Sequence, residues 1–303
     1  MRLHISVAGL RLVIKKVASP HYYSGRSPFL LLIQNFLQLV AFFRTPRPTK
    51  VALKETKRLR NSATGKSALI LGAGPSANKL NVNTTGQFID DIFVINGFNA
   101  LELSKTLKPS FYGLSDPAHF ANLKGERLLE RNQLIEYVTN LGARLVLPHT
   151  MFNSEIFRNS NPLYFDDREL HLFNRNISPL RPRSYCSNTI YKMLALACFM
   201  GYEKIYIIGI DNTNFYNYRG RIDNRLSDIG GNTADKSTDS KSSLIEDFEF
   251  EFTSGISGRM QSYAHLFGDL RFFPKDRIIN LDEFSLIDAF HKVSNHPLVK
   301  PVV

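Results

Sequence analysis

The chain of 303 residues contains no tryptophan and only two cysteines, Cys186 and Cys198. So few cysteines give neither a disulfide framework nor a cysteine-rich metal site, which fits a reducing compartment. No apolar run reaches the roughly twenty residues of a spanning helix. No group of His, Cys or paired carboxylates has metal-ligand spacing, so we expect no metal and no cofactor. The 43% apolar content is ample for one large domain with appendages.

Acidic residues are almost absent from the first 66 positions. This stretch has thirteen lysines and arginines against the single acid Glu55, whereas the whole chain carries a net charge of +11. The basic charge therefore belongs to an N-terminal extension, residues 1–66, and not to the body of the protein. A basic active groove, as nucleic-acid enzymes have, is not indicated, so we expect no nucleic-acid partner.

One stretch of the extension, residues 27–43, is strongly apolar. Its polar residues Gln34, Asn35 and Gln38 share one side of a helix, and basic residues flank it. This pattern predicts a helix lying on an anionic membrane surface; the alternative is a helix packed on the body. No small-residue cleavage site follows, so we expect a cytoplasmic protein, peripheral on the inner face of the cytoplasmic membrane.

The body, residues 67–295, alternates apolar runs with amphipathic stretches and is followed by a tail, 296–303. This order predicts an α/β fold: a single Rossmann-like, doubly wound, mostly parallel sheet. Expected strands are 68–71, 92–95, 111–114, 144–147, 204–208 and 277–281, and expected helices are 101–107, 125–141, 188–200 and 258–270. The polar segment 219–247 cannot bury much surface, so we interpret it as a lid over the site, or else an idle insertion.

The first strand ends in Gly72-Ala73-Gly74-Pro75-Ser76. Glycine leaves room for a phosphate near the backbone, and Pro75 suits the first turn of a helix whose free N–H groups attract anions. The second strand ends in Asn96 and not in the acid that NAD-binding folds carry. We therefore expect a mononucleotide or nucleotide-sugar on Gly72, Gly74, Pro75 and Ser76, or else a purely structural turn.

Polar residues follow the other expected strands, at the edge where such sheets bind ligands. Amide and hydroxyl groups there can bind a nucleobase or sugar, although Asn96 could serve only a turn, Asp211 only a cap, and the histidines only the surface. The helix at 188–200 can present its N-terminus, with Ser187 or Asn188 as cap. The residues of interest are Asn96, Ser115, Asp116, His119, His149, Ser187, Asn188, Thr189, Asp211, Tyr216 and Tyr218.

These motifs together resemble the bacterial lipooligosaccharide sialyltransferases. They also resemble the wider superfamily with motility-associated-factor-like glycosyltransferases and hydroxymethylpterin pyrophosphokinases. The resemblance rests on Gly72 to Ser76, on Asn96-Gly97-Phe98, on Asp116-Pro117, and on the block from Ser187 to Asp211 that contains Gly-Tyr-Glu-Lys-Ile-Tyr-Ile-Ile-Gly-Ile-Asp. It covers residues 66–281.

The resemblance implies roles for individual residues. Asn96 would contact the donor, residues 187–189 its phosphate and sugar, and Tyr216 and Tyr218 the departing phosphate. Asp116 stands where the sialyltransferases have an asparagine, and Ala73 replaces another. Their general-base histidine is missing from Gly255-Ile256-Ser257, so His265 or His119 would take its place. Asp116, Asp211, His265 and His119 are thus the expected catalytic residues.

The implied enzyme is a glycosyltransferase of bacterial surface-polysaccharide assembly, for lipopolysaccharide or capsule. It would use a nucleotide-sugar donor such as CMP-sialic acid, without a metal, and a glycan or glycolipid acceptor; a homo-oligomer is left open. One alternative is a pyrophosphokinase-like enzyme using ATP and magnesium held by Asp116 and Asp211. The other is a non-catalytic nucleotide-sugar-binding homologue.

Overall fold

The computed structural model describes residues 2–7, 10–15, 33, 36–37, 40, 43, 47–115, 119–120, 125–167, 177–181, 189–210, 270–293 and 295–300. Its helices are α2 (Arg47–Arg58), α3 (Val82–Phe88), α4 (Glu126–Leu141) and α5 (Thr189–Met200). Its strands are β1 (Arg2–Val7), β2 (Leu10–Lys15), β3 (Ser67–Leu71), β4 (Asp91–Ile95), β5 (Phe111–Gly113), β6 (Arg144–Pro148), β7 (Leu163–Phe165), β8 (Lys204–Ile208), β9 (Ile278–Asn280) and β10 (His291–Lys292).

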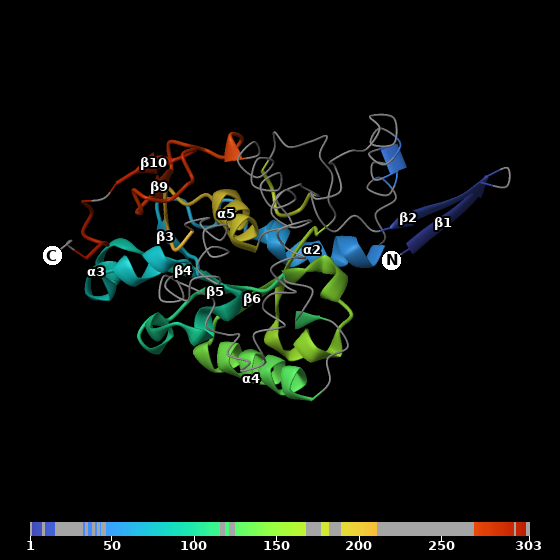
Figure 1. Ribbon diagram of the computed structural model, residues 1–303, viewed down its shortest axis with the longest axis horizontal. Coiled ribbons are helices and arrows are strands. Elements are labelled where there is room, and N and C mark those ends of the chain that lie inside the picture. Colours follow the sequence, from blue (N-terminus) through green and yellow to red (C-terminus); the bar gives the residue numbers. More distant parts are fainter. Residues whose placement is uncertain are drawn as a thin grey trace, which may run out of the picture.

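Eight strands form one sheet in the order β10-β9-β8-β3-β4-β5-β6-β7, and every pairing in it is parallel. The chain runs outward from β3 to β7, then returns through α5 to β8 on the other side of β3 (Figure 1). The strand order therefore reverses between β3 and β8, which is the point where open α/β sheets bind ligands. The expected doubly wound α/β fold is confirmed.

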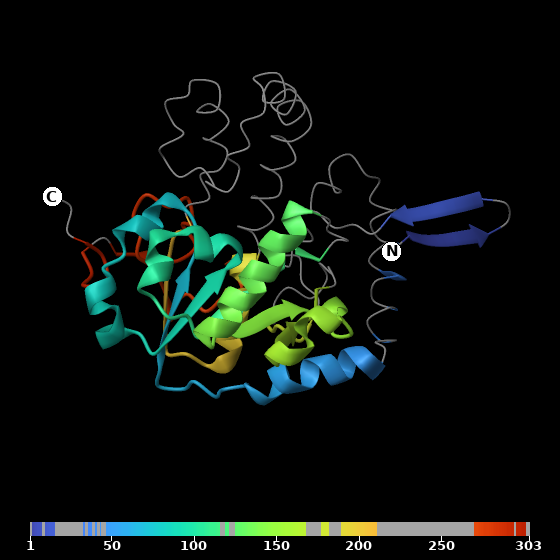
Figure 2. The ribbon, with the colours of Figure 1, turned by 90° about the horizontal axis from the view of Figure 1, so that it is seen from below.

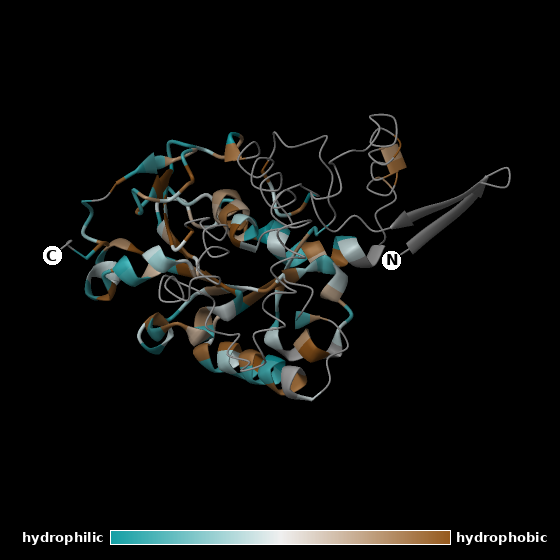
Figure 3. Ribbon diagram, in the orientation of Figure 1, coloured by the Kyte–Doolittle hydropathy of each residue, from teal (hydrophilic) through white to brown (hydrophobic). Residues whose placement is uncertain are grey.

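Helices cover both faces of this sheet, which is why its central strands are apolar runs instead of alternating ones. On one face α5 packs over Ile70 and Phe93, and eleven of its twelve residues are buried. On the other face Leu134 and Val138 of α4 belong to the same core cluster as Leu71. Figures 1 and 2 show α4 and α5 on opposite sides of the sheet, and Figure 3 shows α5 hydrophobic along most of its length.

Helix α2 lies within the stretch assigned to the extension, yet it packs on the edge strand β7. The buried Thr56 hydroxyl donates to the carbonyl of Tyr164 at 2.6 Å, and the Tyr164 N–H donates back to that hydroxyl at 3.1 Å. One threonine thus satisfies both backbone groups of Tyr164, which an edge strand would otherwise leave unpaired on that side. Helix α2 is therefore bound to the sheet edge, and the residues after it are bound to the end of α5, where the N–H groups of Asn61 and Ala63 donate to the carbonyls of Phe199 and Met200.

The remainder of the extension contributes a hairpin and part of a helix. Strands β1 and β2 pair antiparallel, from Arg2 opposite Lys15 to Val7 opposite Leu10. In the apolar stretch the described residues 33, 36–37, 40 and 43 are helical, with Phe36 and Phe43 strongly exposed. Among the residues that the structure describes, no helix has both the length and the hydropathy needed to cross a bilayer.

The expected strands are all present, with bounds shifted by at most one residue. The short strands β7 and β10 and the β1–β2 hairpin were not predicted. The expected helix at 101–107 is a 3-10 helix, Glu102–Lys105, because only one turn forms before Lys108 and Pro109. The lid-like segment 219–247 and the expected helix 258–270, except Leu270, lie outside the described residues.

Candidate functional site at the carboxyl edge of the sheet

The turn after β3 is in direct backbone contact with the end of β8. A Cβ on Gly72 would lie 2.1 Å from the Gly209 carbonyl oxygen, and a Cβ on Gly209 would lie 2.4 Å from the Gly72 carbonyl oxygen. Gly209 also has φ +73°, a left-handed conformation that favours glycine. At Gly72 this close approach is by itself enough to require glycine.

Hydrogen bonds hold the two loops together. The N–H of Gly72 donates to Ile208 O at 2.9 Å, and the N–H of Gly74 donates to Gly209 O at 2.8 Å. The N–H of Gly209 donates to the buried Ser76 hydroxyl at 2.8 Å. The expected helix does begin at Pro75, but it is a 3-10 helix of five residues, Pro75–Lys79. The dipole of so short a helix is small, and two turn amides are already used.

Asn96, directly after β4, has an unusual backbone. Its φ is +36°, which is uncommon for a residue other than glycine, although asparagine tolerates it best. The hydroxyl of the fully buried Tyr112 donates a short hydrogen bond to the Asn96 carbonyl. Burial raises the pKa of Tyr112 well above its usual value, so the hydroxyl stays protonated and remains a donor. Tyr112 thus fixes the Asn96 backbone from beneath.

The Asn96 side chain reaches the first turn of α5. Its Nδ2 donates to Thr189 Oγ1 at 3.3 Å, and Thr189 Oγ1 also shares a short hydrogen bond with Ser115 Oγ. These three side chains come from the ends of β4 and β5 and from the start of α5. The Asn96 Oδ1 atom is buried and accepts no hydrogen bond from any residue that the structure describes. A buried acceptor without a partner costs about 1–3 kcal/mol, and a ligand donor would remove that cost.

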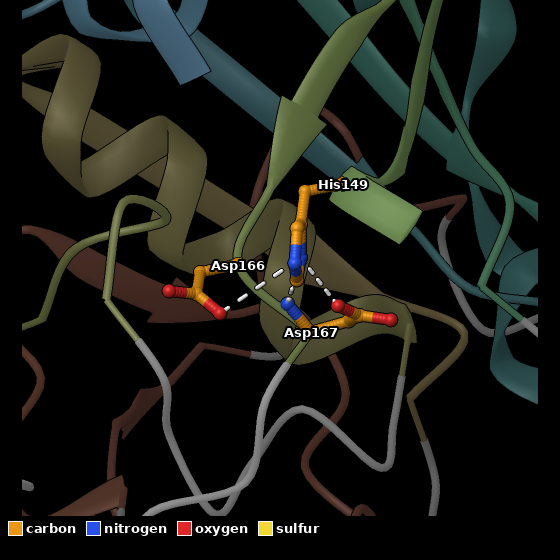
Figure 4. A group of neighbouring side chains, drawn as sticks. All are labelled: His149, Asp166 and Asp167. Atoms are coloured by element: carbon orange, nitrogen blue, oxygen red, sulfur yellow. Dashed lines mark hydrogen bonds and ion pairs between the residues drawn. The ribbon is translucent and has the colours of Figure 1, made fainter. Parts of the chain in front are cut away.

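A second polar group lies at the ends of β6 and β7 (Figure 4). His149 Nδ1 is 2.5 Å from Asp167 Oδ1 and 3.9 Å from Asp166 Oδ1. The side chains are little exposed: 10% for His149, none for Asp166 and 15% for Asp167. The Thr150 hydroxyl donates to Asp167 Oδ2 at 2.9 Å and so holds this carboxylate in place.

The ligand-type atoms of His149, Asp166 and Asp167 lie within 4.8 Å of one another, close enough to consider a metal ion. However, cis ligands at about 2.1 Å from one ion are about 3 Å apart, whereas Nδ1 and Oδ1 here are 2.5 Å apart. The hydrogen bond between the two residues runs from the Asp167 N–H to His149 Nδ1 at 3.4 Å. The contact between Nδ1 and Oδ1 is that of an ion pair, and it is too short for two ligands of one ion.

The structure brings some expected site residues together and leaves others undescribed. Asn96 and Thr189 are hydrogen-bonded, and Gly72, Gly74, Pro75 and Ser76 form the turn at the same edge. His119 lies in the described pair 119–120, half-buried and edge-on to Phe120 at 6.3 Å. The remaining expected residues lie outside the described residues: Asp116, Ser187, Asn188, Asp211, Tyr216, Tyr218 and His265.

Three residues of this edge were not singled out from the sequence. Tyr112 is inside a buried strand, and nothing in the sequence shows that its hydroxyl meets a turn. Asp166 and Asp167 follow β7, whose three apolar residues Leu163-Tyr164-Phe165 were the one available signal. Once that run is recognised as a strand, two aspartates at its carboxyl end become candidates by the same rule that selected Asn96.

Comparisons with known proteins give structural likeness only. A scan against protein-family models finds no match, and a search of curated proteins likewise finds none. Among solved structures, the chain is similar to the sialyltransferase CstII from Campylobacter jejuni in complex with cytidine-5'-monophosphate. The identity is 18%, the TM-score is 0.41, and the match covers 80% of this chain and 89% of that one.

Two further similar structures have lower scores. CstII in complex with CMP-3FNeuAc has 16% identity and a TM-score of 0.38, over 78% of this chain and 89% of that one. The MAf glycosyltransferase from Magnetospirillum magneticum AMB-1 has 15% identity and a TM-score of 0.33, over 61% of this chain and 32% of that one. The resemblance to pyrophosphokinases stays a prediction.

Proposed function

We propose that this protein is a glycosyltransferase that binds a nucleotide-sugar at the carboxyl edge of its sheet, beside Asn96 and Thr189. The observation that carries the proposal is the buried Asn96 Oδ1 atom, whose amide is fixed by Thr189 while its oxygen has no partner among the described residues. The oxygen lies at the carboxyl edge of a parallel sheet, where such folds bind ligands.

The chemistry of this oxygen limits which groups of a ligand can bind to it. A carbonyl-type oxygen only accepts hydrogen bonds, so its partner must be a donor. A phosphate, fully ionised, offers no donor, whereas a ribose hydroxyl, a sugar hydroxyl or the amino group of a base does. Asn96 is therefore suited to the sugar or base part of the ligand. CMP-sialic acid is the first donor to test, because the sequence motifs resemble those of sialyltransferases.

The proposed reaction is direct displacement at the anomeric carbon of the donor by an acceptor hydroxyl, on a glycan or glycolipid of the bacterial surface. Support for a membrane-bound acceptor comes from the extension. Phe36 and Phe43, two helical turns apart, are 62% and 74% exposed in a stretch flanked by basic residues. Exposed aromatic side chains beside positive charge suit the surface of an anionic membrane.

The experiment is titration calorimetry with CMP-sialic acid, CMP, other nucleotide-sugars, and ATP with and without magnesium. We expect a nucleotide-sugar to bind, and the variant Asn96→Ala to bind it about tenfold to a hundredfold more weakly, as the loss of a buried hydrogen bond predicts. The variant Asn99→Ala is the matched control, since Asn99 is exposed on the same turn. Its affinity should equal that of the wild type.

Other outcomes would decide between the alternatives. Binding of ATP only with magnesium would replace the proposal with a pyrophosphokinase-like function. Binding of a nucleotide-sugar with no transfer or hydrolysis over long incubation would indicate a non-catalytic homologue. Equal affinities of the wild type and Asn96→Ala would remove Asn96 from the site.

A further inference from the structure

The N-terminal hairpin of β1 and β2 has two faces of different character. Residues that pair across two antiparallel strands lie on the same face, and successive residues of a strand alternate between the faces. The register therefore places six aliphatic residues on one face: Leu3, Ile5, Val7, Leu10, Leu12 and Ile14. The other face carries Arg2, His4, Ser6, Arg11, Val13 and Lys15. One face of the hairpin is thus entirely aliphatic, and the opposite face is mainly polar and basic.

The described body of the protein does not supply a layer for the aliphatic face. Among the elements that the structure describes, β1 and β2 pack extensively only on each other. In both Figure 1 and Figure 2 the hairpin extends away from the central sheet, beyond one end of α2. A hairpin of two strands is only marginally stable in water unless a further layer covers its apolar face. The aliphatic face therefore requires an occupant from outside the described body.

The charge of the N-terminal stretch favours an anionic membrane as this occupant. The first acidic residue of the chain is Glu55, so no acid accompanies the hairpin or the apolar stretch 27–43. The face opposite the aliphatic one contributes Arg2, Arg11 and Lys15. At the boundary of an anionic bilayer, aliphatic residues enter the acyl region while nearby cations attract the lipid phosphates. The two faces of the hairpin match these two regions of the bilayer.

A second copy of the hairpin is a poorer fit to the aliphatic face. Six residues of a strand span about 20 Å and two strands are about 10 Å wide, so the face covers about 200 Å². Even if surface relief doubles that area, two such faces would bury about 800 Å² together, whereas stable interfaces bury at least about 1,200 Å². Pairing two copies would also bring their basic residues together without any acid to compensate them.

We propose that the hairpin of β1 and β2 inserts its aliphatic face into an anionic membrane, as an anchor separate from the apolar stretch 27–43. The inference does not depend on the proposed glycosyl transfer, because vesicle binding needs no nucleotide-sugar. Two linked anchors hold a protein at a membrane more firmly than either does alone, since binding of the first raises the local concentration of the second.

The main test uses the absence of tryptophan from the chain, which makes an introduced tryptophan the only one that emits. Leu12→Trp and Val13→Trp place this residue at neighbouring positions of β2, on opposite faces of the hairpin. The full chain is mixed with vesicles of phosphatidylethanolamine and phosphatidylglycerol. We expect the emission of Leu12→Trp to shift to the blue and to be quenched by brominated acyl chains. Val13→Trp is the matched control and should stay accessible to iodide in water.

The strength of vesicle binding is a second measurement. The double variant Ile5→Ser with Leu12→Ser changes one pair in the middle of the aliphatic face. Its vesicle partition coefficient should fall about tenfold to a hundredfold, as the loss of two partly inserted aliphatic side chains predicts. The control His4→Ser with Val13→Ser changes the adjacent pair on the basic face and should bind vesicles like the wild type.

Other results would overturn the inference. A blue shift of Leu12→Trp without vesicles would assign the face to a second copy if it grows with protein concentration, and to another part of the same chain if it does not. Equal quenching of Leu12→Trp and Val13→Trp by brominated lipid, or equal partition of the two double variants, would exclude insertion of one face. Binding to vesicles of phosphatidylcholine alone as strong as to the anionic vesicles would contradict the preference for an anionic surface.

Discussion

The contact between Gly72 and Gly209 allows backbone strain and atomic crowding to be measured separately. The chain has three glycines that differ in these two properties. Gly65 has φ +80° with nothing within 4 Å of the place where a Cβ would lie, so an alanine there meets strain alone. Gly209 has φ +73° and a neighbouring carbonyl oxygen 2.4 Å from the Cβ position, so it meets both. Gly72 has an ordinary φ and a carbonyl oxygen at 2.1 Å, so it meets crowding alone.

The magnitudes follow from these environments. An alanine in the left-handed region costs about 1–2 kcal/mol, which is the expected loss of stability for Gly65→Ala. Overpacking a rigid interior adds about 1–3 kcal/mol, so Gly209→Ala should lose about 2–5 kcal/mol. Gly72→Ala should lose at least as much as crowding alone predicts, because the added Cβ is fixed to the backbone and the oxygen that it meets is the backbone carbonyl of Gly209, so neither atom can rotate away.

The assay is urea unfolding of the three variants, followed by circular dichroism, with nucleotide-sugar affinity measured in parallel. Gly209→Ala should also weaken ligand binding, since its amide and carbonyl hold Ser76 and Gly74 in place. Gly65→Ala should bind normally, because Gly65 precedes β3 at the opposite edge of the sheet. Equal stability losses for Gly65→Ala and Gly209→Ala would refute the close contact between β3 and β8.

Two further predictions concern pH and the membrane. Burial and the charge of Lys204 lower the pKa of His296, and its Nδ1 accepts the Leu298 N–H at 3.2 Å, so the unfolded chain binds the proton more readily than the folded one. The stability of the fold should therefore fall as the pH drops below about 6.5. In His296→Gln the urea midpoint should depend less on pH in this range, whereas an unchanged slope would exclude His296 as the source. Replacing both Phe36 and Phe43 with serine should reduce co-sedimentation with anionic vesicles, whereas the control Phe284→Ser, at an equally exposed residue on the body, should not. Equal sedimentation of the wild type, the double variant and the control would show that the two phenylalanines do not contribute to membrane binding.

The central sheet could be predicted from the sequence because its strands are buried on both faces. Runs such as 68–71 and 205–208 are apolar throughout, and helices separate them along the chain. The edge strands β7 and β10 have only three and two residues, so no run stands out from the surrounding turns. Their pairing is decided by contacts with β6 and β9, which the local sequence does not encode.

The sequence predicts individual residues of the candidate site, because each follows a strand, but it does not predict which of them are hydrogen-bonded to one another. Asn96 was expected from its place after a strand, yet its partner Thr189 is 93 residues away, and Ser115 is 74 residues from Thr189. The sequence also could not show the contact of Gly72 with Gly209, since a glycine required by a neighbouring backbone and one required by a phosphate are identical in the sequence. His149 was a candidate because it follows a strand, but its contact with Asp167 could not be predicted, since Asp167 follows the strand β7, which the sequence did not predict.

Hydrogen bonds within the protein are distributed unevenly along this edge of the sheet. At β3 and β8 the amides of Gly72, Gly74 and Gly209 are already bonded within the protein, which makes the centre of the edge rigid and leaves few donors there. At β4 and β5 the Asn96 side chain is held through its Nδ2 atom by Thr189, so that its Oδ1 atom accepts no hydrogen bond from any described residue. A hydroxyl or amino group of a ligand would supply the hydrogen that Oδ1 lacks, whereas an ionised phosphate would not. This part of the edge therefore suits a sugar or a base better than it suits a phosphate alone.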